Sequence, residues 1–493
     1  EGSLPAEDSL SAEGSLPAEG SLPAEDSLPA EDSLPAEDSN DPPTVEKTER
    51  PSIAQLAFPS ILGNLLFAVV GMVQTKFVGE LGPDAVAAVG IGQRVFFGLQ
   101  AVMMAVSAGT TALVARAWGA GDKVEAGRVT MASLALATVF GLLLTVPGIL
   151  FARPVASIFG LSPETVDLAA EYIIWLSIFN VAFGLNFIIG AGLRAAGDAW
   201  SPLWLGIGIN ILNLGLLYGF VFGAWGFPEM GAPGTAVAGG VSFAVGGVLT
   251  AALWFKQVFR LRYVASGWAR PDRFLRLLHI GYPAAVEMII FQIGFFFFFM
   301  LMGNYYGTEA FAAYSVGTNV LSVCMVIGFG FSIAGSTLVG QHLGAGDPDG
   351  AARSGWRAMG YAVAAMATIG WSMAFFAEEL AHFFLTDAPL TIELTTYMIV
   401  ILGIAMPLLA AEFALGGALR GAGDTRFPLI ATFIGLIGVR CTLTALFTFL
   451  GWPVVWVYAT LLGEYLVKAT MLTLRFRSGR WKHVIPHSVP HAP

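Results

Sequence analysis

Long runs of apolar residues fill most of the chain between residues 53 and 475, and short clusters of glycine, proline or charge separate them. In residues 283–303, Glu287 is the single ionisable side chain, over a length close to the ~20 residues that a helix needs to cross a bilayer. No alternating pattern appears, so helices that satisfy their own backbone hydrogen bonds are the expected spanning elements. The breaks predict twelve membrane-spanning helices, at residues 53–78, 86–115, 124–150, 165–190, 200–223, 232–256, 278–303, 311–340, 352–376, 392–417, 427–450 and 452–475.

Short motifs recur in the second half of the chain at a nearly constant offset of 224–226 residues. Six helices return the chain to the same side of the membrane, so the two repeats are expected to be parallel, with the substrate path between them. The motif arginines, Arg194 and Arg420, are expected to anchor at lipid headgroups. The recurring pairs are Gly119–Asp122 with Gly344–Asp347, Leu193–Asp198 with Leu419–Asp424, and Pro59 with Pro283.

The predicted fold is an all-α polytopic membrane protein, with twelve transmembrane helices in two six-helix pseudo-symmetric bundles. The N-terminal residues repeat a Ser-Leu-Pro-Ala-Glu hexamer, in which regular proline and few apolar side chains favour disorder. The expected organisation is a disordered acidic hexapeptide-repeat tail (1–50), an N-terminal six-helix bundle (51–256), a basic cytoplasmic linker (257–277), a C-terminal six-helix bundle (278–475) and a cytoplasmic tail (476–493).

Composition and charge agree with a membrane protein. The chain is 56% hydrophobic and 12% charged, whereas soluble domains carry about 25% charged residues. Twelve of the 35 acids lie in residues 1–41, which contain no base, so the net charge of −10 belongs to the tail. The remainder is nearly neutral, and no nucleic-acid partner is expected. Basic residues gather in the central linker and after residue 474, which predicts a multi-pass protein of the plasma (inner) membrane with both termini cytoplasmic.

Three segments carry a family resemblance. Gly109–Arg116 runs into the first Gly-Ala-Gly-Asp loop, Gly417–Thr425 reads Gly-Ala-Leu-Arg-Gly-Ala-Gly-Asp-Thr, and Pro283–Glu287 reads Pro-Ala-Ala-Val-Glu. With the early-helix prolines and the duplication, the chain resembles bacterial members of the multidrug and toxic-compound extrusion (MATE) family over about residues 51–480. The resemblance implies export of organic cations or other amphipathic compounds, driven by inward flow of protons or sodium.

The chain departs from the family pattern late in its first helix. Members of the family usually carry an aspartate there, tied to cation coupling, and this chain has Gln74. Because an amide does not titrate and carries no formal charge, the resemblance does not extend to coupling through the N-terminal bundle.

Ionisable groups at membrane depth are costly and therefore indicate functional sites. Glu287, one turn after Pro283, and Glu412, one turn beyond the break expected at Pro407, are the candidate cation-coupling residues. Arg440 is the candidate counter-charge for one of these acids. Glu464 and Lys468 stand four residues apart, in the order that favours an intrahelical pair.

Neutral polar residues mark a second candidate region. Gln74 and four asparagines of the N-terminal bundle either line a polar cavity or bond across helices. The four are Asn180, Asn186, Asn210 and Asn213.

The sequence contains neither a phosphate-binding loop with lysine nor a His-Glu-x-x-His zinc motif. We therefore expect no catalytic residues, no metal site and no cofactor beyond the coupling ion, H+ or Na+, and we expect a monomer that is not an enzyme. The expected partners are a small-molecule cargo, the coupling cation and the lipid bilayer. The predicted function is secondary active efflux by antiport through alternating access. The alternative is a lipid-linked precursor flippase, for which arginines should line an inner cavity.

Overall fold

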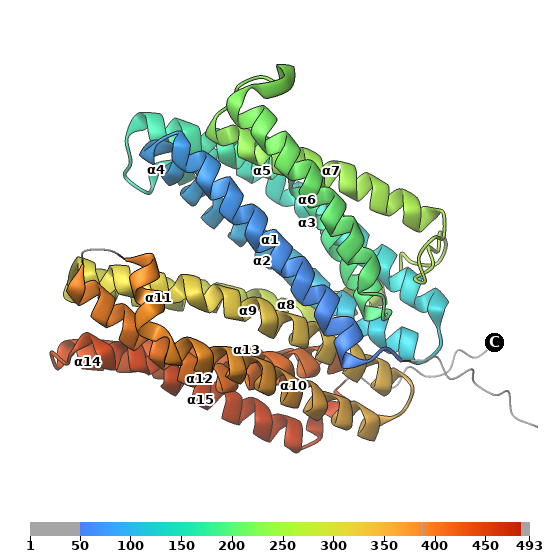
Figure 1. Ribbon diagram of the computed structural model, residues 1–493. Helices are drawn as coiled ribbons and strands as arrows, with labels where there is room; N and C mark the ends of the chain where they lie inside the picture. Colours follow the sequence, from blue (N-terminus) through green and yellow to red (C-terminus); the bar gives the residue numbers. More distant parts are fainter. Residues whose placement is uncertain (1–49, 386–387, 485–493) are drawn as a thin grey trace, which may run out of the picture. The chain divides into compact units, whose positions relative to one another are not determined.

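The computed structural model describes residues 50–385 and 388–484. The expected disordered tail therefore lies outside the described residues, apart from Arg50, as does the end of the cytoplasmic tail. The regular structure within the described ranges is helical (Figure 1).

The first half of the helical region, the N-half, contains the helices up to Phe255. They are α1 Ile53–Glu80, α2 Pro83–Gly119, α3 Lys123–Leu150, α4 Ala152–Ser157, α5 Pro163–Ala195, α6 Trp200–Phe222, the 3-10 turn η1 Ala224–Gly226, and α7 Ala232–Phe255.

The second half, the C-half, repeats this order from Pro271 onwards. Its elements are α8 Pro271–Tyr305, α9 Gly307–Gly344, α10 Pro348–Phe375, α11 Ala377–Phe384, α12 Pro389–Ala422, α13 Arg426–Thr432, the π-helix η2 Phe433–Cys441, α14 Thr442–Phe449, α15 Val454–Arg477 and the 3-10 turn η3 Arg480–His483.

The fold confirms an all-α polytopic membrane protein. In the described part of the chain, eleven helices are long and apolar enough to cross a membrane, with α13, η2 and α14 counted together as the span Arg426–Phe449. The twelfth long helix, α15, has 24 residues and is less apolar because it carries Glu464, Lys468 and two terminal arginines. Blue-to-green α1–α7 and yellow-to-red α9–α15 form two groups in Figure 1.

Two details differ from the predicted boundaries. The helix α8 begins at Pro271, inside the stretch 257–277 that was expected to be a linker. The rest of this stretch packs on the N-half, since Leu261 is fully buried and its carbonyl accepts a hydrogen bond from the Trp254 indole at 2.9 Å. The apolar pattern could not reveal this because the segment is rich in arginine.

The recurring loop motif has the same local structure in both halves. Asp122 accepts a hydrogen bond from the Glu125 N–H at 2.7 Å, and Asp347 accepts one from the Gly350 N–H at 2.7 Å. Each carboxylate thus caps the N-terminus of the helix that follows it. The preceding glycines, Gly121 and Gly346, have φ of +81° and +70°, a conformation that favours glycine. The motif therefore encodes a tight turn followed by a capped helix.

We call the end of the helices that carries these two loops the inner end. Close glycine contacts join the two halves there. The backbone of Gly119 packs against the backbone carbonyl of Gln341, and a Cβ on Gly340 would lie 2.7 Å from the Cβ of Ala115. The Gln341 amide, which is 1% exposed, donates a hydrogen bond to the Ala195 carbonyl at 2.9 Å. The halves therefore meet tightly at the inner end.

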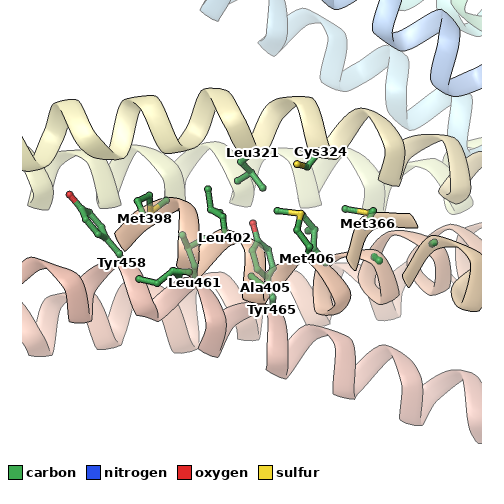
Figure 2. Close-up of a cluster of buried hydrophobic side chains, with 14 of the residues drawn as sticks. Leu321, Cys324, Met366, Met398, Leu402, Ala405, Met406, Tyr458, Leu461 and Tyr465 are labelled. Atoms are coloured by element: carbon green, nitrogen blue, oxygen red, sulfur yellow. The ribbon is translucent and has the colours of Figure 1, made fainter. Parts of the chain in front are cut away.

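The largest core cluster among the described residues lies mainly in the C-half, between α8, α9, α10, α12 and α15, and also includes Leu56, Ala57 and Ala199 of the N-half. Figure 2 shows its side chains interleaving between these helices. The packing fixes how α12 and α15 are rotated toward each other, which matters for the charged residues they carry. Members of the cluster include Leu321, Cys324, Met366, Met398, Leu402, Ala405, Met406, Tyr458, Leu461 and Tyr465.

Candidate functional site

A chain of ion pairs is buried among three helices of the C-half. The Lys468 ammonium lies 2.7 Å from Glu464 Oε1 and 3.1 Å from Glu412 Oε1, so it bridges α15 and α12. On its other side, Glu464 Oε2 lies 3.1 Å from Arg440 Nη1. Glu464, Lys468 and Arg440 are only 1–3% exposed. Two carboxylates and two cations thus balance each other, as a low-dielectric interior requires.

The π-helix η2 places Arg440 in this cluster. A π-helical stretch is rare and occurs frequently at functional sites. Here it directs the guanidinium into the C-half, where Nη2 donates to the Tyr314 hydroxyl. The Arg440 Cζ also lies 4.3 Å from the centre of the Phe298 ring, within cation–π range. Phe298 is fully buried, so this member of the five-phenylalanine run packs inward.

A second ion pair lies on α8 and α12. Arg420 Nη2 lies 2.7 Å from Glu287 Oε1, and the Thr432 hydroxyl donates to the same oxygen at 3.0 Å. Glu287 follows Pro283, where the proline removes a backbone hydrogen bond within α8. This acid is therefore held by groups from two other elements beside a weakened point of its own helix.

A small cavity of about 10 Å³ lies between the Glu412–Lys468 pair and the Glu287–Arg420 pair, and these four residues are among those that line it. This is about the smallest volume that holds a water molecule. Glu412 Oε2 is buried and has no hydrogen-bond partner among the described residues. One free carboxylate oxygen is thus available in a site whose other charges are paired.

The neutral polar residues of the N-half form separate contacts. Gln74 donates to the Tyr172 hydroxyl at 3.2 Å. Asn186 donates to the Phe243 carbonyl at 2.7 Å and accepts from Thr250 at 3.3 Å. Asn210 donates to the Gly206 carbonyl within its own helix, at 2.8 Å. The contacts of Gln74 and Asn186 cross between helices, whereas that of Asn210 stays local.

Other buried amides of the N-half lack partners within the described residues. Asn180 is fully buried and neither its nitrogen nor its oxygen is hydrogen-bonded, and the Asn213 oxygen is unpaired. Gln100, which we did not predict, is 8% exposed with both amide atoms unpaired. An unpaired buried amide costs about 1–3 kcal/mol.

Three expectations about the C-half need correction, two about charged residues and one about a helix. Arg440 pairs with Glu464, and not with Glu287 or Glu412. Arg420 binds Glu287 instead of anchoring at lipid headgroups. The helix α12 continues through Pro407, so the break expected there does not occur.

Sequence reasoning also missed two members of the site. Lys468 was interpreted as the partner of Glu464 alone, yet it reaches Glu412 on another helix. Thr432 gave no signal, because a single threonine in an apolar run is common. The signal that could have indicated Arg420 is that the apolar stretch 280–305 around Glu287 contains no base.

A duplicated helical membrane protein with paired charges buried between its helices has the features of a secondary transporter. The MatE family model matches residues 59–218 and 283–446. The chain belongs to this family of membrane transporters, whose members are not enzymes.

Individual relatives agree with this assignment. The chain is 32% identical over 442 residues to the probable multidrug resistance protein NorM of Thermotoga maritima, covering 88% of this chain and 93% of the relative. A MOP superfamily transporter from Pyrococcus furiosus superposes with a TM-score of 0.80 at 21% identity, covering 87% and 94% of the two chains. A MATE protein in complex with MaL6 gives a TM-score of 0.81 at 21% identity, covering 86% and 95%. The two structures support the fold alone.

Proposed function

We propose that this chain is a secondary active multidrug exporter that exchanges amphipathic, cationic small molecules for protons through alternating access. The paired charges around the small C-half cavity, with one free oxygen on Glu412, are the observation that carries the proposal. Efflux of drug-like compounds is supported by the similarity to the probable multidrug resistance protein NorM.

The charge balance favours protons over sodium. Each of the three membrane acids already contacts a base: Glu287 contacts Arg420, and Glu412 and Glu464 share Lys468. Hard metal cations take oxygen ligands, whereas two groups that line the cavity are themselves cations. A proton needs only one carboxylate oxygen and almost no space.

Proton binding and cargo binding then exclude each other. With all groups ionised, the three carboxylates and three bases of the two ion-pair clusters sum to zero charge. A proton on Glu412 Oε2 gives this region one positive charge, which repels a cationic cargo. When the proton leaves to the inner side, the region is neutral again and accepts the cation. This exchange ties the direction of cargo movement to the proton gradient.

The proposal places the protein in the plasma (inner) membrane with both termini in the cytoplasm, so the inner end faces the cytoplasm. Each chain contains both halves, and we propose that it works as a monomer in the lipid bilayer. The lipid-linked precursor flippase is not favoured, because the chain belongs to the MatE family and because Arg420 and Arg440 are both ion-paired.

The test is uptake of ethidium, whose charge does not change with pH, into proteoliposomes. An acidic lumen in sodium-free buffer should drive accumulation, and a sodium gradient at equal pH should not. Glu412→Gln should abolish the response to the proton gradient. The matched control is Glu393→Gln, an exposed acid on the same helix, which should behave as the parent protein. Accumulation driven by sodium alone would disprove proton coupling.

A further inference from the structure

The internal repeat allows each residue of the C-half ion pair to be assigned a counterpart in the N-half. Arg420 corresponds to Arg194 within the recurring motif, at an offset of 226. Glu287 lies four residues after Pro283, and the residue four after Pro59 is Gly63. Thr432 lies twelve residues after Arg420, and the residue twelve after Arg194 is Gly206.

The two arginines hold the same orientation on their helices. A Cβ on Gly190 would lie 3.2 Å from Arg194 Nη1, and a Cβ on Gly416 would lie 3.3 Å from Arg420 Nη1. Both glycines stand four residues before their arginine. Each guanidinium therefore lies back over the preceding helical turn in the same way.

Their partners differ. Arg420 contacts the carboxylate of Glu287, which Thr432 also binds, whereas both counterpart positions in the N-half are glycines. Arg194 is partly buried, and none of the ten ion pairs within residues 50–385 and 388–484 includes it. The N-half therefore has the base without the acid.

Neither glycine position is closed at its Cβ. A Cβ on Gly63 would have Leu203 Cδ1 as its nearest neighbour outside α1, at 3.7 Å, and a Cβ on Gly206 would meet no atom within 4 Å. An unpaired guanidinium inside a membrane protein is costly and is by default a functional group. Arginine binds carboxylates in well-defined geometry, as its counterpart Arg420 does.

We propose that Arg194 binds the carboxylate group of a cargo molecule, in the position that Glu287 occupies in the C-half. This inference rests on the proposed function and adds a preference within its cargo class: compounds that carry a carboxylate as well as a cation bind more tightly than cations without one. The Arg194 carbonyl accepts a hydrogen bond from Thr337 of the other half, at 3.3 Å. The site therefore lies near the inner end, where the two halves meet.

The test compares two dyes that differ in a carboxylate. Rhodamine 110 has a free carboxylate, and rhodamine 123 is its methyl ester. Binding is measured by fluorescence anisotropy with the full chain in detergent and without any ion gradient, so the result does not depend on coupling. The parent protein should bind rhodamine 110 on the order of tenfold more tightly than rhodamine 123, as a charge-assisted hydrogen bond implies.

Two substitutions should remove this preference while leaving rhodamine 123 binding unchanged. Arg194→Gln removes the guanidinium, and Gly63→Glu supplies an internal carboxylate that competes with the dye. Gly63→Gln, with the same size and no charge, and Arg153→Gln at an exposed ion pair should keep the preference. If Arg194→Gln does not fold, the Glu and Gln variants of Gly63 decide the question by themselves.

Unchanged rhodamine 110 binding in Gly63→Glu would overturn the proposal. A lipid phosphate is the other source of an anion, so binding is repeated in nanodiscs of phosphatidylcholine with and without phosphatidylglycerol. Loss of the preference only with phosphatidylglycerol would assign the site to a lipid headgroup and would also overturn the proposal. Failure of proton-driven ethidium uptake, with the dye preference intact, would reject coupling and leave this site standing.

Discussion

The two halves share the same order of helices and turns but differ in the polar and charged side chains that they bury. In the C-half, the membrane acids each contact a base, in two clusters around a small cavity. In the N-half, Asn186 stands at the repeat position of Glu412 and Gly63 at that of Glu287. Within the described ranges, the buried side-chain atoms of the N-half that lack hydrogen-bond partners belong to the amides of Gln100, Asn180 and Asn213 and to the Arg116 guanidinium. Turns, caps and helix contacts are thus alike in the two halves, while charge is distributed unequally.

The largest effect should come from Lys468, because it neutralises two acids at once. Lys468→Met should lower the free energy of unfolding by about 3–5 kcal/mol, the usual result of leaving buried charges unpaired. Adding Glu412→Gln should restore most of the loss, since Glu464 keeps Arg440. Thermal unfolding in detergent measures both changes.

The N-half control is Gln74→Leu, which removes the hydrogen bond from the Gln74 side-chain amide to the Tyr172 hydroxyl. This substitution should lower the free energy of unfolding by about 1 kcal/mol. Equal losses in the free energy of unfolding for Lys468→Met and Gln74→Leu would show that the buried ion pairs of the C-half stabilise the fold no more than a single hydrogen bond of the N-half.

A second test asks which half couples transport. Glu287→Gln should reduce proton-driven ethidium uptake at least tenfold, because the neutral amide leaves the Arg420 charge uncompensated beside the cavity and so disfavours a proton on Glu412. Gln74→Asp puts into α1 the acid that relatives usually carry, and it should leave the rate within about twofold of the parent. A gain of sodium-driven uptake in Gln74→Asp would place a coupling site in the N-half after all.

The smallest expected difference lies in the two loop caps. The Gly350 N–H holds the pKa of Asp347 below its usual value, and the nearby His342 lowers it further. Asp347→Ala should therefore cost somewhat more than the ~1 kcal/mol of a lost helix cap. Asp122→Ala, in the equivalent turn of the N-half, should cost the cap alone.

The pH dependence of Asp347→Ala follows from the direction of the shift. A lowered pKa stabilises the folded protein fully above the unfolded value of about 3.9. The extra loss should thus be present at pH 5–7 and should shrink as the pH falls through the folded pKa. The free energy of unfolding of the parent and of Asp347→Ala, measured across this pH range, gives the extra loss. A loss that grows on acidification would contradict a lowered pKa for Asp347.

Most of the fold could be predicted because its signals are local. Apolar length gives the helices, and the recurring Gly-Ala-Gly-Asp turns have the same φ signs and the same caps in both halves. The prediction failed where the structure depends on contacts between residues that are distant in the sequence. The π-helix around Arg440, the continuous helix through Pro407 and the packed linker at Leu261 each depend on neighbours far away in the chain.

The membrane class, the duplication, the family resemblance and the presence of acids at depth thus follow from the amino-acid sequence. The tertiary structure alone decided which acid contacts which base: Glu287 with Arg420, Glu412 with Lys468, and Glu464 with both Lys468 and Arg440. The physical reason is that an ion pair between helices depends on their rotation and register. Core packing sets the rotation and register of the helices, as between α12 and α15 in Figure 2. The spacing of residues within one helix does not reveal how that helix is turned toward another.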